Sequence, residues 1–150
     1  MISKTTEYAL AASVCLAGPE GSLTAGQIAD TCRLPLGYLS KVLRLLARAG
    51  IVTSRRGPTG GFQLQRPPEA ITLLEVIRAV DPFERIKVCP LGLPRHEDHL
   101  CPLHKRLDSA VELLEGCFAS TTLAELVDHD IIDRLVTRKR DDKNPPREQP

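Results

Sequence analysis

Residues 89–104, CPLGLPRHEDHLCPLH, bring together side chains that could bind a soft metal. They contain two cysteines and three histidines, namely Cys89, His96, His99, Cys101 and His104. Thiolates anchor iron–sulfur clusters, and an imidazole can replace a thiolate on one iron. Two cysteines with two histidines are also a common structural zinc set. The residues alone leave four interpretations open: a cluster, another metal, a disulfide, or a loop that binds nothing.

The cellular compartment bears on this choice. The N-terminus, MISKTTEYALAASV, begins with polar residues and lacks the basic region and long apolar stretch of a signal peptide. No apolar run approaches the roughly 18 residues of a membrane span. We therefore expect a cytoplasmic protein without a membrane partner. In that reducing setting the five cysteines are more often thiols or metal ligands than a disulfide framework.

Composition restricts the class of protein. The 150 residues fit one compact domain or a small domain with an appendage. Hydrophobic residues make up 42% of the chain but aromatic residues only 3%, so the core must be aliphatic. Such a core is typical of small helical proteins that bury further surface by oligomerising.

Positive charge is concentrated in the first half of the chain. Seven basic residues and no acidic residue lie from Arg33 to Arg66, although the net charge is only +1. The rest of the chain carries 13 basic and 19 acidic residues. Because Lys and Arg displace the counterions that condense on phosphates, this segment suits a polyanion-binding surface. On charge alone, a solvated basic face is the alternative.

Apolar periodicity predicts helices over residues 4–17, 24–32 and 36–50. Thr24 and Gln27 fit a capping box, and Gly50 fits the position that follows a helix. The third helix should bury Leu39, Val42, Leu43, Leu46 and Ala47. Cys15 and Cys32 fall on apolar helix faces, where we interpret them as small hydrophobic residues.

A β-hairpin should follow, because IVTSRRGPTGGFQLQ places turn residues between two β-favouring runs. Capping boxes at Thr72–Glu75 and Thr122–Glu125 predict two further helices, the second with Leu126, Ile131, Ile132 and Leu135 inward. The segment from Pro102 to about Phe118 should be a long helix with a coiled-coil seam. That seam consists of Leu103, Leu107, Ala110, Leu114 and Cys117, so Cys117 should lie in the core or at an interface.

Three short helices and a Gly-rich hairpin describe a winged helix-turn-helix, and so a mainly α fold with a small β-hairpin. The third helix would lie in the major groove of DNA, and an arginine of the hairpin could enter a narrow minor groove. Taken singly, the glycines could be an ordinary turn and the arginines a solvated loop. The predicted DNA-binding residues are Thr24, Gly37, Tyr38, Ser40, Lys41, Arg44, Arg55, Arg56, Thr59 and Gly60.

Four motifs carry a resemblance to a known family: TTEYAL, AGQIAD, LPLGYLSKVLRLLARAGIV and RRGPTGGFQL. They resemble the bacterial regulators that include IscR, NsrR and RirA, the Rrf-two family, to about residue 135. The resemblance implies a homodimeric winged-helix transcription factor that dimerises through its long helix and binds a palindromic operator in double-stranded DNA. It matches Tyr38, Ser40 and Lys41 to DNA contacts and Arg56 to the wing arginine. Where a well-known relative has an acidic residue, this chain has Ser40, so operator preference does not transfer.

The resemblance also implies a ligand set for an iron–sulfur cluster, of the 2Fe–2S rather than the 4Fe–4S type. Cys89 and Cys101 match the outer two of three family cysteines, and His104 matches a histidine that follows them. The middle position is Arg95, which cannot ligate a metal because it stays protonated. The fourth ligand could be His96, His99, or Glu7 from the partner subunit, as in family members with an acidic residue there. Zinc, or no ligand, remains possible.

These expectations divide the chain into a DNA-binding domain (1–82), a sensor loop (83–101), a dimerisation helix with a C-terminal helix (102–137) and a disordered tail (138–150). The expected function is a transcriptional regulator, a repressor, that senses redox, nitric oxide or iron status. A cluster-free thiol-based or zinc-containing regulator is the alternative. An enzyme with a Cys101–His104 pair would need an oxyanion-hole loop and an orienting group, which the sequence does not offer, so we expect no enzyme. A partner-binding module without DNA is the third possibility.

Overall fold

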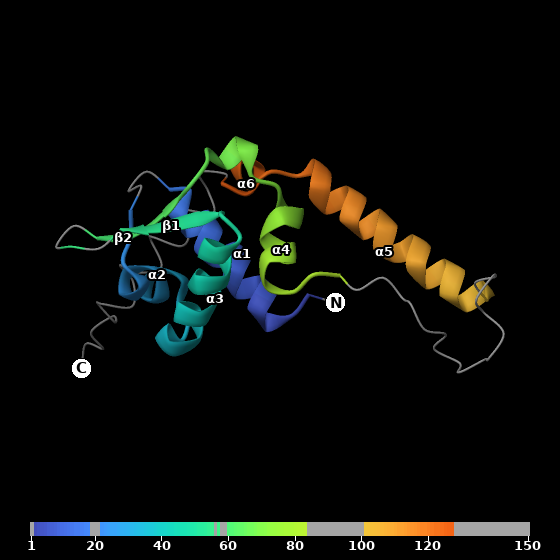
Figure 1. Cartoon of the computed structure of the whole chain (residues 1–150), viewed down its shortest axis with the longest axis horizontal. Coiled ribbons are helices and arrows are strands. Elements are labelled where there is room, and N and C mark those ends of the chain that lie inside the picture. The colour runs from blue at the N-terminus through green and yellow to red at the C-terminus, as the bar shows by residue number, and fades with distance from the viewer. Residues whose placement is uncertain (1, 19–21, 56, 58–59, 84–100, 128–150) are drawn as a thin grey trace, which may run out of the picture.

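The computed structural model describes residues 2–18, 22–55, 57, 60–83 and 101–127. In the described part, helices surround one aliphatic core, a short hairpin lies at one side, and one long helix extends away at the other (Figure 1). Cys89, His96, His99, the second half of the last predicted helix and the predicted tail lie outside the described residues.

The first three helices are α1 (Lys4–Leu16), α2 (Ala25–Cys32) and α3 (Leu36–Arg48). Ser3 caps α1, and the predicted capping box of Thr24 and Gln27 begins α2. Between α2 and α3 the chain turns at Arg33, whose φ of 55° is in the left-handed region. Gly50, with φ of 72°, follows the end of α3 as predicted.

The hairpin consists of β1 (Val52–Arg55) and β2 (Gly61–Leu64), which pair antiparallel with Val52 opposite Leu64. A further bridge joins β2 to the segment before α2, since Phe62 and Leu23 exchange two backbone hydrogen bonds of 2.7 and 2.9 Å. The hairpin is therefore fixed to the helix-turn-helix at its base, and its two strands lie at one side of the helices (Figure 1).

The chain then forms a short 3-10 turn, η1 (Pro68–Ala70), and helix α4 (Leu73–Val80), which begins with the predicted Thr72–Glu75 capping box. Helix α5 (Pro102–Ser120) leads to α6 (Leu123–Leu126). An isolated antiparallel bridge between Thr72 and Thr122 joins the start of α6 to the segment between η1 and α4. Along α5, Arg78 of α4 makes an ion pair of 2.9 Å with Glu115.

The core is aliphatic, as the composition predicted. It contains the buried leucines and valine of α3 together with residues in or next to α1, α2, β1, α4 and α6, all at most 7% exposed, including Ala9, Ala12, Ile28, Leu39, Leu43, Leu46, Ile51, Ile71, Val76 and Leu123. Ala47 of the predicted stripe is only partly buried. The predicted capping boxes, the hairpin and the helices up to α5 are confirmed within the described residues. The last predicted helix, which was expected to continue to Leu135, ends at Leu126. Thr6 and Ser13 of α1 are buried with the apolar residues, which the apolar pattern did not predict.

Helix α5 contributes little apolar surface to this core. Leu103, Leu107 and Leu113 are 42%, 39% and 71% exposed in the single chain. Cys117 is exposed as well. The prediction that it lies in the core is therefore wrong for the single chain, and the alternative, that it lies at an interface, stays a prediction.

Candidate functional site

The outward face of α3 is the first candidate surface. Gly37, Lys41, Arg44 and Arg48 are exposed, and Tyr38 is 39% exposed, whereas Ser40 is half-buried. We call these six residues the α3 surface. The opposite side of the helix is the buried leucine and valine stripe, so the helix has one core face and one basic face.

The cations of the α3 surface are available for an anionic ligand. Within the described residues, Lys41, Arg44 and Arg48 have no carboxylate partner, although Arg44 Nε donates to the Ser40 carbonyl at 3.2 Å. Arg66, at the end of the same acid-free segment, differs. Its guanidinium donates to Glu75 at 2.7 Å and to the Ala70 carbonyl at 2.9 Å. Free basic groups on an exposed helix are what phosphate contacts require.

Two residues of α1 hold Tyr38 in place. The hydroxyl groups of Tyr38 and Thr5 are 2.5 Å apart, and the ring of Tyr8 packs edge-on against the Tyr38 ring with centroids 5.5 Å apart. Thr5 and Tyr8 were not predicted as supports, because nothing in their spacing indicates which helix they contact.

The hairpin presents a second set of candidates. Arg55 is exposed at the end of β1, whereas Arg56 and Thr59 lie outside the described residues. Gly57 has φ of 119°, and its carbonyl accepts from the N–H of Gly60 at 2.9 Å. Gly61 lies where the hairpin meets the segment before α2. A Cβ there would lie 2.7 Å from the Leu23 carbonyl oxygen, so glycine permits the bridge to Leu23.

Thr24 has the predicted capping role, and its contact with DNA stays a prediction. Its hydroxyl accepts from the N–H of Gln27 at 3.2 Å, and the Gln27 side chain accepts from the N–H of Thr24 at 2.8 Å. Thr24 is exposed, so its backbone still lies at the surface where α2 begins.

Two of the candidate metal ligands lie together at the start of α5. Cys101 is the N-cap residue, and its Sγ accepts from the N–H of His104 at 3.4 Å. The two side chains are 7% and 2% exposed. Glu7 is exposed on α1 and makes an ion pair of 2.6 Å with Lys4. Within the described residues, no three Cys, His, Asp or Glu side chains form a metal-binding group.

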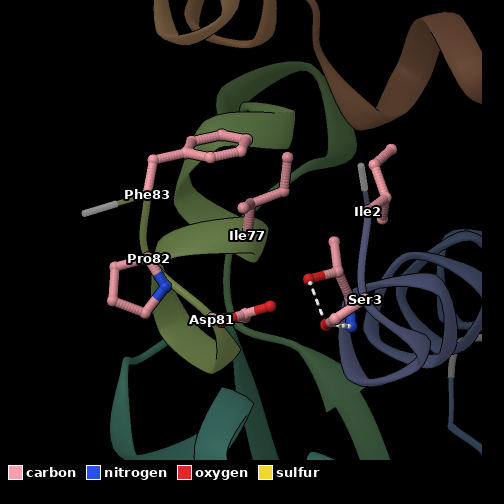
Figure 2. Close-up of a pocket in the computed structure, with 7 residues that line it drawn as sticks. Ile2, Ser3, Ile77, Asp81, Pro82 and Phe83 are labelled. Carbon is pink, nitrogen blue, oxygen red and sulfur yellow. Dashed lines mark hydrogen bonds between the residues drawn. The ribbon is translucent and has the colours of Figure 1, made fainter. Parts of the chain in front are cut away.

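A pocket of about 170 Å³ lies between the start of α1 and the end of α4. Its lining is Ile2, Ser3, Thr6, Ile77, Asp81, Pro82 and Phe83. In Figure 2 the Asp81 carboxylate and the Ser3 hydroxyl face each other across it. Phe83, in this lining, is the last described residue before the gap at residues 84–100, and no sequence pattern predicted the pocket. None of the helices in the described ranges is long and apolar enough to cross a membrane.

Comparison with known sequences agrees with this geometry. The family described as Rrf2, iron-dependent transcriptional regulator, matches residues 2–129. An HTH-type transcriptional regulator of Aquifex aeolicus (strain VF5) is 29% identical over 131 residues, which cover 85% of this chain and 91% of that protein.

Solved structures are similar in fold. CymR, the global cysteine regulator of B. subtilis, has a TM-score of 0.68 and 29% identity, over 85% of this chain and 95% of CymR. IscR of T. potens has a TM-score of 0.69 and 26% identity, over 85% of each chain. The helices and hairpin are thus the winged helix of these regulators. The chain belongs to the Rrf2 family of transcriptional regulators.

Proposed function

We propose that this protein is a cytoplasmic, homodimeric repressor that binds a palindromic operator in double-stranded DNA. The α3 surface is the observation that carries the proposal. It is exposed, it contains no acidic residue, and its cations have no carboxylate partner among the described residues. Helix α3 would enter the major groove, and Arg55 and Arg56 of the hairpin would reach the neighbouring minor groove.

The exposed face of α5 supports the homodimer. Leu103 and Leu107, each about 40% exposed, belong to the predicted seam with Ala110, Leu114 and Cys117. A second copy of α5 would remove these side chains from water, at roughly 25 cal/mol for each Å² of apolar surface buried. Two symmetric chains match the two half-sites of a palindrome.

We further propose that Cys89, Cys101 and His104 bind a 2Fe–2S cluster, with His96, His99 or the partner subunit's Glu7 as fourth ligand. The placement of Cys101 and His104 fits such a group, because the Cys101 sulfur contacts the His104 N–H and both residues are shielded from water at one helix start. When bound, the cluster would supply a redox-active group that responds to oxidants, nitric oxide or iron supply.

Anaerobic isolation tests the cluster. The protein should contain iron and sulfide in equal amounts and absorb visible light, and air should bleach it. A colourless protein without iron, purified anaerobically from iron-replete cells, would contradict the cluster and leave the DNA-binding proposal intact.

Salt titration of duplex binding tests the DNA interface. Replacing Arg44 with Ala should lower the slope of log affinity against log salt by about one, because one phosphate contact is lost. Arg66→Ala is the matched control, since Arg66 already pairs with Glu75. A slope that neither variant changes would exclude the α3 surface as the phosphate-binding face.

A cluster-free regulator is the second candidate, and the similarity to CymR favours it. In this case Cys89 and Cys101 would act as thiols, or would hold zinc together with two of the histidines, for which a Cys2His2 set is suitable. Zinc in place of iron in the anaerobic protein, or full thiol reactivity without metal, would support this candidate.

A further inference from the structure

Two cysteines outside the sensor loop meet where α1 and α2 pack together. Cys15 is on the last turn of α1, and Cys32 is the last residue of α2. Cys32 Sγ donates to the Ala11 carbonyl at 3.5 Å. Ala11 lies one turn before Cys15, and side chains of a helix lean towards its N-terminus. The Cys15 side chain is therefore directed towards the carbonyl that Cys32 contacts.

The electrostatics of Cys32 agree with this proximity. A side-chain hydrogen bond with Cys15, followed by burial, raises the pKa of the Cys32 thiol. Both cysteines are reduced and half-buried, so each keeps part of its surface in contact with solvent. The earlier interpretation of both as small hydrophobic residues thus omits the main feature of the site, which is a pair of adjoining thiols.

We propose that Cys15 and Cys32 are a modification site that a low-molecular-weight disulfide converts to an intramolecular disulfide, and that this closure weakens DNA binding. The second part rests on the proposed function; the first part does not. The site differs from the Cys/His loop, because both thiols belong to the helices of the DNA-binding unit.

The chemistry is thiol–disulfide exchange. The Cys15 thiolate attacks one sulfur of the small disulfide, and the other sulfur leaves as a thiolate that takes up a proton. Cys32, deprotonated by solvent, then attacks the Cys15 sulfur, and the second small thiol leaves. The protein loses two electrons and two protons, and the reagent is reduced to two thiols. Because the two sulfurs adjoin, the mixed disulfide should not accumulate.

Closure would act on the turn that positions α3. A disulfide holds its sulfurs about 2.05 Å apart, which is closer than any contact between two thiols. Cys32 is followed directly by Arg33, the one described residue other than glycine with positive φ. The next residue, Leu34, donates to the Ala29 carbonyl at 2.9 Å, and Pro35 precedes α3. Drawing Cys32 towards α1 therefore moves a constrained three-residue connection to α3.

Peptide mapping tests the first part. Trypsin cuts after Lys4 and Arg33, and no Lys or Arg lies between them, so one peptide, residues 5–33, contains both cysteines. The full-length protein is treated with 2-hydroxyethyl disulfide, alkylated and digested. The reduced peptide should carry two alkyl groups. The oxidised peptide should carry no alkyl group, and its mass should be two hydrogen atoms below that of the same peptide with two unalkylated thiols.

Single variants identify the partners. Cys15→Ser and Cys32→Ser should each abolish the light peptide, whereas Cys117→Ser should retain it. The proposal would be overturned if the peptide keeps one hydroxyethylthio group from the reagent, or if it is linked to a peptide that contains another cysteine.

Affinity is then measured on a duplex selected from a random pool by the reduced protein. Oxidation should weaken binding by about five-fold, and dithiothreitol should restore it. The loss should disappear in Cys15→Ser and Cys32→Ser but persist in Cys117→Ser. An unchanged affinity of the disulfide form would overturn the regulatory part. If the reduced protein selects no DNA, the proposed function fails, while the peptide result still decides whether the pair closes.

Discussion

The hydroxyl of Tyr38 at the start of α3 lies 2.5 Å from the hydroxyl of Thr5 on the first turn of α1. Tyr8, one turn further along α1, supports the same ring edge-on. Tyr38 is partly exposed on a helix whose outward face also carries the cations Lys41, Arg44 and Arg48. The contact therefore fixes the one aromatic side chain of the α3 surface before any ligand binds.

The Thr5–Tyr38 contact should strengthen DNA binding by preorganising Tyr38. Thr5→Val keeps the shape of residue 5 but removes the hydrogen bond, whose net value is about 1 kcal/mol, so affinity should fall by up to about five-fold. Tyr38→Phe removes the same bond from the other side. If the tyrosine hydroxyl acts only through Thr5, the double variant should be no weaker than either single variant. Additive losses would mean that the hydroxyl contacts DNA itself.

Gly61 should be essential for attaching the hairpin to the helices. In Gly61→Ala the added Cβ would meet the carbonyl oxygen and carbon of Leu23 at 2.7 and 2.8 Å, and neither backbone atom can move without breaking the bridge to Phe62. We expect a loss of about 1–3 kcal/mol in the free energy of unfolding, measured in urea.

Gly116 provides the matched control for Gly61. It lies within α5, and nothing lies within 4 Å of a Cβ built there. Gly116→Ala should therefore stabilise the protein by roughly 0.5–1 kcal/mol, because alanine favours the helix. Equal effects of the two substitutions would contradict the role assigned to Gly61.

Local patterns predicted the elements of this fold well, and contacts between elements poorly. The capping boxes at Thr24, Thr72 and Thr122 each begin a helix, because a capping box involves only residues three positions apart. The pairing of Cys15 with Cys32 depends on how α1 and α2 cross, which no local spacing encodes.

The same limit applies to the candidate site. Apolar periodicity identified the outward face of α3, since the inward stripe fixes the rest of the helix. Periodicity did not reveal that His104, in the first turn of α5, would be only 2% exposed, or that Cys101 before it would be buried as well. For Cys89, His96 and His99, the assignment as ligands stays a prediction.

Glu75 should make stability depend on acid pH. Burial alone would raise the pKa of this carboxyl, but the hydrogen bond from the Thr72 N–H and the hydrogen bond and charge of Arg66 outweigh it, and the pKa is lowered. A carboxyl with a lowered folded pKa stabilises the protein above its unfolded pKa of about 4.3, and this contribution is lost as the pH falls through the folded value.

Glu75→Gln separates this effect from general acid unfolding. Glutamine can still occupy the capping box, but it does not titrate. Between about pH 6 and pH 3, the variant should lose less stability in urea than the original protein, by a modest amount because Glu75 is 41% exposed. The exposed Glu69, on η1, serves as control: Glu69→Gln should follow the original curve.

Cys101 combines two roles that one substitution can separate. As N-cap of α5 its sulfur accepts from the His104 N–H at 3.4 Å, and as a candidate ligand it offers a soft donor. Serine is a preferred N-cap but a poor ligand for iron–sulfur clusters. Cys101→Ser should therefore keep or raise the thermal unfolding temperature of the metal-free protein, followed by circular dichroism, while iron and sulfide in the anaerobically purified protein fall to background. Cys117→Ser should change neither measurement. A Cys101→Ser variant that retains its iron would show that Cys101 caps the helix and does not bind the cluster.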